Sequence, residues 1–257
     1  VAAGDCSARS YPEGGLMKEV LGCLRRADED FSMIAPGDHV AVGVSGGKDS
    51  LLLLYALALY RRFCKHPYTL TAVTLTMGLE PFDLSGVRTL CEKLDVPYEV
   101  RETQIGKVIF EERKEKNPCS LCAKMRRGAL VDLCLEIGAN KLALGHHRDD
   151  AIETLFLSML YEGRIHTFHP VTHLTRKNIT QIRPLIYLPE KHVIHMVKAL
   201  SLPVVPSPCP ANGRTKRDDI RDLLNEICRR KPDARELLLS ALQNEAQYGL
   251  WEKPKHS

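Results

Sequence analysis

A short glycine-rich loop is the feature of this sequence that most restricts the possible folds. Residues 45–50 read SGGKDS; they follow a β-branched run at residues 39–44 and precede an apolar stretch that extends to about Phe63. This order predicts a strand, a tight loop and a helix. Glycines let the backbone approach an anion closely, and the first turn of a helix directs N–H groups toward it. The loop therefore indicates a phosphate-binding site at the end of a strand, although the Walker spacing G-x-x-x-x-G-K-[ST] is absent.

Strand and helix patterns alternate along most of the chain. Strands are predicted at residues 39–44, 70–76, 98–101 and 141–144, and helices at residues 16–34, 49–63, 85–94, 121–137 and 149–160. Such alternation is typical of parallel βαβ units, so the predicted fold class is α/β, a doubly wound parallel sheet with helices on both faces. After Gly163 the alternation is lost, and further helices are expected at about residues 190–200 and 215–248.

Three regions are expected from these patterns. An N-terminal tail and helix occupy residues 1–35, the phosphate-loop domain occupies residues 36–188, and a helical C-terminal extension packed on that domain occupies residues 189–257. The longest apolar run, residues 51–60, is shorter than the roughly 20 residues that a membrane span needs, and the N-terminus lacks the basic-then-apolar pattern of a signal peptide. A cytoplasmic protein with no membrane partner is the expectation.

Eight of the nine cysteines fall into two groups, and Cys6 in the N-terminal tail is left unassigned. Cys119 and Cys122 form a C-x-x-C pair, and Cys209 lies between two prolines. A lone C-x-x-C pair is compatible with zinc, a redox pair or an iron–sulfur cluster. Three protein thiolates without a fourth would leave one iron of a cluster open to a further ligand. Five other cysteines lie in amphipathic helical patterns and are interpreted as packing residues, namely Cys23, Cys64, Cys91, Cys134 and Cys228.

Several segments resemble known families. Residues 45–50 resemble the SGGxDS signature of the PP-loop ATP pyrophosphatases, which split ATP between the α- and β-phosphates and transfer AMP to a carbonyl oxygen. Residues 119–128 (CSLCAKMRRG), 145–150 (GHHRDD) and 183–190 (RPLIYLPE) resemble, in the same order, segments of the tRNA 2-thiocytidine synthetase family. The resemblance extends over about residues 20–230 and is therefore not confined to one short motif.

The resemblance implies an ATP-dependent enzyme that adenylates C2 of an anticodon-loop cytidine in tRNA and replaces its oxygen with sulfur. It implies ATP, Mg²⁺ and a [4Fe-4S] cluster as cofactors, with the cluster on Cys119, Cys122 and Cys209. The residues after Cys209 depart from the family's C-x-x-C-G-S-Q pattern. The implied partners are tRNA and a sulfur donor, either a cysteine desulfurase or sulfide. Because twofold dimers are the commonest assembly and the family tends to form them, a homodimer is expected.

Candidate site residues follow from the loop and from the matched segments. The carboxylate of Asp49 is expected to hold Mg²⁺ against phosphate oxygens. The expected catalytic residues are Asp49, Arg126 and Asp150. The expected ATP-binding residues are Ser45, Gly46, Gly47, Lys48, Asp49, Ser50, Gly145, His146 and Asp149, and the expected tRNA-binding residues are Lys124, Arg127, Arg214, Lys216 and Arg217. His147 is a further candidate for contact with nucleotide or cluster. The alternative for the basic residues is a solvated helix face, and the alternative for Asp149 is a helix N-cap.

Three other functions fit parts of the sequence. A lysidine-type ligase would share the loop but would not explain the C-x-x-C pair, and a PP-loop enzyme of small molecules is compatible with the net charge of +4. A nucleotide-sensing module with a structural zinc would not need the carboxylate of Asp49. Within the thiolase hypothesis the sulfur carrier is either the open cluster iron or a persulfide of Cys119 or Cys209, and the alternative substrate is another tRNA base or a small molecule.

Overall fold

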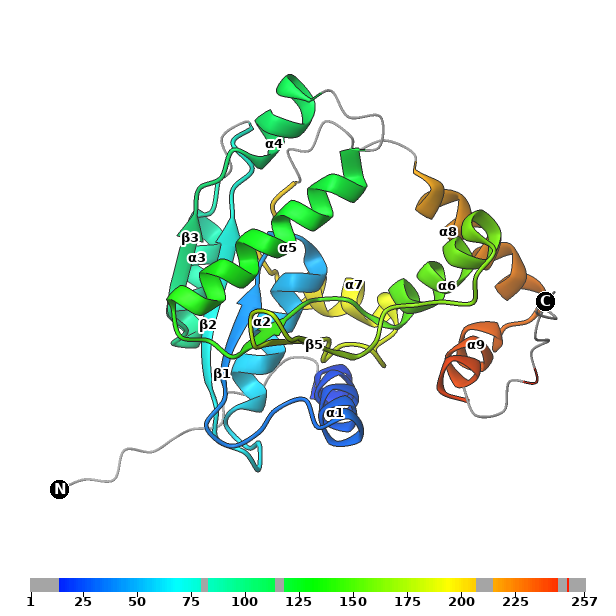
Figure 1. Cartoon of the computed structure of the whole chain (residues 1–257). Coiled ribbons are helices and arrows are strands. Elements are labelled where there is room, and N and C mark those ends of the chain that lie inside the picture. Colours follow the sequence, from blue (N-terminus) through cyan, green and yellow to red (C-terminus); the bar gives the residue numbers. More distant parts are fainter. Residues whose placement is uncertain (1–13, 80–82, 114–117, 207–214, 245–248, 250–257) are drawn as a thin grey trace, which may run out of the picture. The chain divides into compact units, whose positions relative to one another are not determined.

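One six-stranded sheet forms the centre of the fold (Figure 1). The computed structural model describes residues 14–79, 83–113, 118–206, 215–244 and 249. The strands are β1 (His39–Gly43), β2 (Thr69–Leu75), β3 (Tyr98–Arg101), β4 (Lys141–Ala143), β5 (Val171–Leu174) and β6 (Ile179–Ile182), in the spatial order β3-β2-β1-β4-β6-β5. Neighbouring strands are parallel except for β5 and β6, which form an antiparallel hairpin at one edge. The predicted doubly wound α/β fold is confirmed, and the hairpin is an addition to it.

The strand order reverses its direction at β1. β1 pairs with β2 on one side and with β4 on the other. After β1 the chain therefore adds β2 and β3 on one side, and it then crosses back to add β4 on the other side. In open α/β sheets, ligands bind at such a point, beyond the carboxyl ends of the two strands. The topology therefore places the residues that follow β1 and β4 at the expected ligand site.

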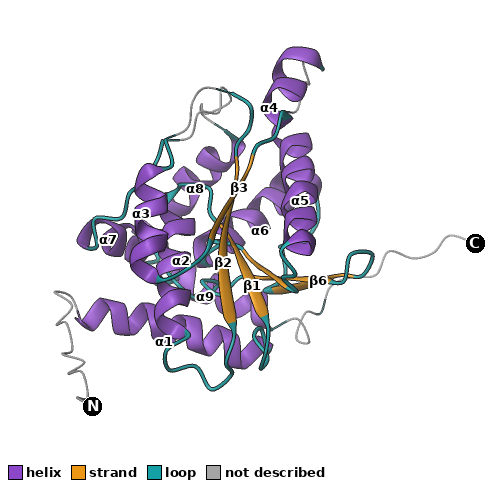
Figure 2. Cartoon of the chain, turned by 90° about the vertical axis from the view of Figure 1, so that its left-hand side faces the viewer, coloured by secondary structure: helices purple, strands orange, loops and turns teal. Residues whose placement is uncertain are grey.

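Helices cover both faces of the sheet. Figure 2 shows α5 on one face and α2 and α3 on the other. The helices are α1 (Gly14–Phe31), α2 (Lys48–Tyr60), α3 (Ser85–Leu94), α4 (Ile105–Lys107), α5 (Pro118–Glu136), α6 (Arg148–Glu162), α7 (Glu190–Ala199), α8 (Lys216–Arg230) and α9 (Ala234–Gln243), with a π-helical turn, η1 (Val108–Glu112), after α4. In the part of the chain that the structure describes, no helix is both long and apolar enough to cross a membrane.

The helix α2 is apolar on nearly all sides because other elements cover it on nearly all sides. It packs against β1 and β2 and also against α1, α3 and α7. Leu51, Leu52, Leu53 and Leu54 are all fully buried, although consecutive residues of a helix point in different directions. This burial fixes the first turn of α2, which carries the phosphate loop.

The chain divides into two compact units. The first contains Val1–His147 and His169–Gly213 and includes the sheet, and the second contains Arg148–Phe168 and Arg214–Ser257. In the second unit α6, α8 and α9 pack around Ile152, Ile220 and Leu224.

This division differs from the expected boundary between residues 188 and 189. Helix α7 lies in the first unit because Val193, Met196 and Val197 are buried where α7 packs on α1 and α2. Helix α6 lies in the second unit because its apolar side packs on α8 and α9. Periodicity predicts that a helix has an apolar side, but it does not indicate which other element covers that side.

Candidate active site at the phosphate loop

The loop between β1 and α2 is held by its own serines. Ser50 donates from Oγ to the carbonyl of Gly47 at 2.9 Å and accepts from the backbone N–H of Ser45 at 3.1 Å. Gly46 has a φ of 81°, in the left-handed region that glycine adopts without strain. Ser45 and Ser50, which we expected to contact ATP, are thus also the groups that shape the loop.

Gly145 approaches the start of α2 so closely that no side chain fits there. A Cβ atom built on Gly145 would lie 2.9 Å from the carbonyl carbon of Asp49 and 3.0 Å from the backbone nitrogen of Ser50. Gly145 follows β4, the neighbour of β1 in the sheet. The structure therefore brings this predicted ATP-binding glycine against the phosphate loop, as expected for two loops at one switch point.

Four charged or titratable side chains meet at this loop. The Nζ atom of Lys48 lies 3.0 Å from Oδ1 of Asp49 and 3.1 Å from Oε1 of Glu190. His147 is only 2% exposed, and its Nε2 atom lies 3.5 Å from Oδ1 of Asp49. Burial by itself lowers the pKa of Lys48, but the carboxylates of Asp49 and Glu190 outweigh it and raise the pKa above its ordinary value. Glu190 ends the family-like segment 183–190 but was not predicted as a site residue, and its contact with Lys48 is what brings it to the loop.

The C-x-x-C pair belongs to the same unit as the loop. Helix α5 begins at Pro118, three residues earlier than predicted, so Cys119 lies in its first turn and Cys122 lies about one turn later. Thiolates are favoured at a helix N-terminus by the partial positive charge there. Helix α5 leads into β4, so its first turn lies toward the carboxyl edge of the sheet (Figure 1). Cys122 is half-buried, whereas the side chain of Cys119 and the whole of Cys209 lie outside the described residues.

The segment that leads toward Cys209 touches the phosphate loop. The backbone N–H of Val205 donates to the carbonyl of Gly46 at 2.9 Å. Val205 precedes Cys209 by only four residues in the sequence. The described residues that precede Cys209 therefore lie beside the phosphate loop, and the assignment of Cys119, Cys122 and Cys209 to a cluster stays a prediction.

Comparison with known proteins decides the family. Residues 24–227 match the family model described as the PP-loop domain. Proteins named tRNA-cytidine(32) 2-sulfurtransferase from Pelobacter propionicus and Geobacter metallireducens are each 37% identical to this chain, over 89% and 88% of its length and over 86% and 90% of their own. The chain belongs to the tRNA-cytidine(32) 2-sulfurtransferase family of PP-loop proteins. The family resemblance seen in the sequence is thereby confirmed.

A solved structure shares the fold of this tRNA-cytidine(32) 2-sulfurtransferase family member. The U34-tRNA thiolase NcsA from Methanococcus maripaludis, whose structure includes its [4Fe-4S] cluster, matches with a TM-score of 0.75 and 24% identity. The match covers 95% of this chain and 82% of that chain. It supports the assignment of the mostly parallel sheet and its flanking helices to the PP-loop fold.

Basic side chains of the family's RRG and RPL segments lie in the first unit. Arg126 is half-buried, and Lys124 and Arg127 are exposed on α5. Arg183 directly follows β6 and donates from Nη1 to the carbonyl of His169 at 2.7 Å. Burial and the nearby Arg127 lower the pKa of Arg183 to about 10. Burial is the larger of the two causes, and Arg127 adds a second positive charge near Arg183.

The aspartates of the GHHRDD segment form ion pairs within the second unit. Asp149 pairs with Arg235 of α9 and, at 3.6 Å, with Arg148. Asp150 pairs with Arg217 of α8 at 3.4 Å. Because α6 begins at Arg148, Asp149 lies inside the first helical turn, and the N-cap alternative for it is wrong.

Two of the predicted tRNA-binding residues also have contacts in the second unit. Arg217 pairs with the buried Glu153 at 3.1 Å, and the Nζ atom of Lys216 lies 4.5 Å from the ring centre of Tyr161. Arg214 lies outside the described residues. The alternative of a purely solvated helix face therefore does not describe Arg217, which holds α8 on α6.

The packing interpretation of the remaining cysteines is confirmed most clearly for two of them. Cys91 and Cys134 are buried, and burial raises the pKa of their thiols to about 11 and about 12, respectively. Cys23, Cys64 and Cys228 are half-buried and form no disulfide bond within the described residues. A thiol that is buried and protonated at neutral pH acts as a small apolar side chain.

Proposed function

We propose that this chain is an ATP-dependent tRNA sulfurtransferase that replaces the C2 oxygen of an anticodon-loop cytidine with sulfur. Membership of the tRNA-cytidine(32) 2-sulfurtransferase family supports the assignment of tRNA as the substrate. The phosphate loop before α2 supports the use of ATP. ATP and tRNA are both available in the cytoplasm, which is where we propose that the protein acts. The homodimer stays a prediction, which light scattering of the purified protein checks.

The first chemical step is adenylation. The cytidine O2 attacks the α-phosphorus of ATP, and pyrophosphate leaves with the electron pair of the broken P–O bond. The N–H groups at the start of α2 and the ammonium of Lys48 bind the phosphates, and the carboxylate of Asp49 would hold Mg²⁺, which neutralises charge on the phosphate oxygens. Arg126 is proposed to stabilise the negative charge at the α-phosphate.

The second step exchanges oxygen for sulfur. A sulfide sulfur adds to C2, the C2–O bond breaks, and AMP leaves with the former carbonyl oxygen. Cys119, Cys122 and Cys209 would hold a [4Fe-4S] cluster, whose open iron can bind sulfide when the cluster is present. The donor is either free sulfide or a cysteine desulfurase. The contacts on tRNA that we assigned to Lys124, Arg127, Arg214, Lys216 and Arg217 stay predictions. So do the nucleotide contacts of Gly145, His146 and Asp149 and the catalytic role of Asp150.

A single reaction distinguishes this proposal from its alternatives. Anaerobically purified protein is mixed with ATP, tRNA, sulfide and lysine, and pyrophosphate release and nucleoside masses are measured. We expect tRNA-dependent pyrophosphate and a cytidine whose mass corresponds to an oxygen-to-sulfur exchange. A modified cytidine that carries lysine would indicate a lysidine-type ligase, and pyrophosphate release without tRNA would indicate a small-molecule substrate; either result overturns the proposal.

A matched pair of cysteine variants tests the sulfur step. Cys122→Ser should retain tRNA-dependent pyrophosphate release and lose sulfur transfer, because adenylation does not use the thiolate. Cys134→Ala removes a buried thiol of the same helix and should retain both activities. Equal sulfur transfer by the wild type and Cys122→Ser would exclude a role for the C-x-x-C pair.

A further inference from the structure

The ammonium of Lys48 lies between two carboxylates. Its Nζ atom lies 3.0 and 3.1 Å from the two oxygens of Asp49, and 3.1 Å from Oε1 of Glu190. The three side chains are between 21% and 31% exposed, so water screens these contacts only in part. Both ion pairs are therefore available to the same lysine without a change in the backbone.

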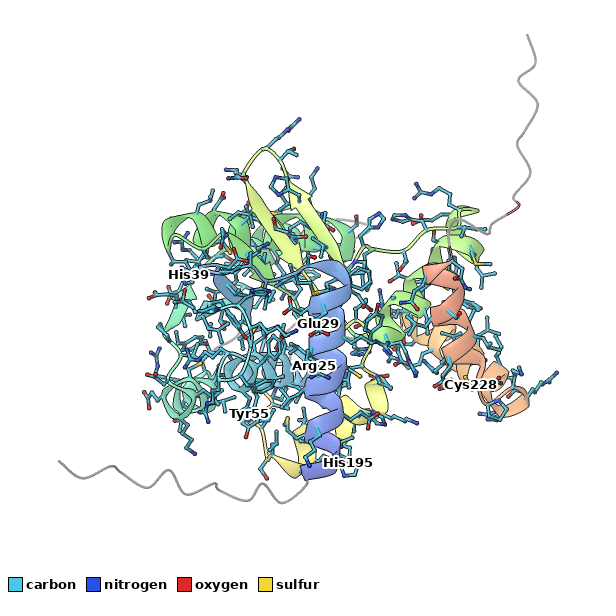
Figure 3. All side chains as sticks on the ribbon, turned by 90° about the horizontal axis from the view of Figure 1, so that it is seen from below. Arg25, Glu29, His39, Tyr55, His195 and Cys228 are labelled. Atoms are coloured by element: carbon cyan, nitrogen blue, oxygen red, sulfur yellow. The ribbon has the colours of Figure 1, made fainter. Side chains whose placement is uncertain are left out.

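Glu190 is presented by a helix that is fixed on the rest of the first unit. It is the first residue of α7, directly after Pro189. On the same helix, Nδ1 of His192 lies 3.1 Å from Oε1 of Glu19 on α1, and buried apolar residues pack α7 on α1 and α2. Figure 3 shows His195 of α7 beside the N-terminal end of α1, with Arg25 and Glu29 farther along that helix. Glu190 therefore has a defined position relative to Lys48.

Lys48 and a metal ion would compete for Asp49. A divalent cation on the Asp49 carboxylate would lie close to the ammonium, and two positive charges at such a separation repel each other strongly. When Lys48 leaves Asp49, its partly buried ammonium needs a counter-charge beside the phosphates that it binds, and its three N–H donors allow it to reach both. Glu190 offers that counter-charge at the distance of a direct ion pair.

We propose that Glu190 is a positioning residue that draws Lys48 away from Asp49 when a metal–nucleotide complex occupies the loop. The inference rests on the part of the proposed function that concerns ATP and Mg²⁺, and it does not depend on tRNA or on sulfur. Glu190 touches neither the metal nor the phosphates in this role. It acts by leaving the oxygens of Asp49 available to the metal while Lys48 stays neutralised.

Metal binding in the absence of turnover tests the proposal. Mn²⁺ is titrated into the full-length chain with α,β-methylene-ATP, which cannot be split between the α- and β-phosphates, and free Mn²⁺ is measured by its electron paramagnetic resonance signal. We expect Glu190→Gln to raise the Kd of Mn²⁺ by about tenfold, the effect of one charge-assisted contact. Glu190→Asp, which retains the charge, should recover most of the affinity.

Two further variants separate this role from a structural one. Glu19→Gln removes a carboxylate of α1 that contacts His192 of α7 and should leave the Kd of Mn²⁺ unchanged. In a Lys48→Met background the ammonium is absent, so Glu190→Gln should change the Kd by less than about twofold. An unchanged Kd in Glu190→Gln, or an equal effect with and without Lys48, overturns the proposal. If wild-type protein binds no Mn²⁺ with the nucleotide, the metal role of Asp49 fails as well, and that result is distinct from the other two.

Discussion

The Nε2 atom of the buried His147 lies 3.5 Å from the Oδ1 atom of Asp49. His147 follows β4 and Asp49 lies in the first turn of α2 after β1, so this contact joins the two loops of the switch point. The carboxylate that we propose as the metal ligand is thus oriented from the neighbouring strand. Gly145, two residues before His147, lets the backbone after β4 pack directly against the backbone of the same turn.

The first prediction concerns this contact. His147→Leu conserves volume but removes a polar ring that lies 3.5 Å from Asp49, so pyrophosphate release should fall by roughly tenfold, about the effect of one weak contact to a charged group. His173→Leu, at an exposed position on β5, should leave the rate unchanged. Equal rates for wild type and His147→Leu would mean that the contact does not orient Asp49.

The second prediction concerns Gly145. A methyl group at this position must displace the backbone of Asp49 and Ser50, so Gly145→Ala should destabilise the fold by about 1–3 kcal/mol and weaken ATP binding. Gly128→Ala is the matched control, because Gly128 lies inside α5 and a methyl group there meets no atom within 4 Å. It should stabilise the helix by about 0.5–1 kcal/mol. Thermal unfolding and nucleotide titration measure both effects, and similar behaviour of the two variants would contradict the close approach.

The third prediction compares a buried ion pair with an exposed one in the second unit. Glu153 is 1% exposed and accepts from Arg217 and Arg221, so Glu153→Gln removes the buried negative charge that the two cations share and should cost about 3 kcal/mol. Glu226 pairs with Arg229 and Arg230 on the surface of α8, and Glu226→Gln should change stability by less than about 0.5 kcal/mol. Hydrogen exchange of the α6 and α8 amides measures both. Comparable losses would show that burial does not decide the strength of these pairs.

The fourth prediction concerns thiol reactivity. Because burial raises the pKa of Cys134 to about 12, only on the order of one molecule in ten thousand carries its thiolate at pH 8. Iodoacetamide at that pH should label the half-buried Cys122 in cluster-free protein well before Cys134 or Cys91. As the pH rises, Cys91, with a pKa of about 11, should react before Cys134. Mass spectrometry of peptides gives the order, and early labelling of Cys134 would contradict its burial.

The same thiols should lower stability in base. A raised pKa in the folded state means that the contribution of the thiol is fully present below the ordinary thiol pKa and is lost as the pH rises through the folded value. The free energy of unfolding should therefore decrease above about pH 9, by up to roughly 1.4 kcal/mol per pH unit for each such thiol. Cys134→Ala should show a smaller slope than the wild type between pH 9 and the folded pKa of about 12. An identical slope would assign the loss to other groups.

The sequence by itself determined the local features of this protein. Gly46 and Gly47 between a β-branched run and an apolar run predicted the strand, loop and helix, because backbone freedom and side-chain periodicity act within a few residues. The order of strands and helices then predicted a parallel sheet, since short connections and right-handed crossovers leave few alternatives. The antiparallel hairpin of β5 and β6 was not predicted, because its strands are short and lie in a stretch rich in polar residues.

Only the tertiary structure decided which distant side chains meet. No local pattern joins Glu190 to Lys48, His147 to Asp49, or Arg235 to Asp149, because each pair is brought together by the packing of separate helices and strands. The same holds for the division into units, where α7 packs with the sheet and α6 packs with α8 and α9. The strength of an ion pair depends on the distance between its two charges. That distance is set by the packing of apolar surfaces between helices and strands that lie far apart in the sequence.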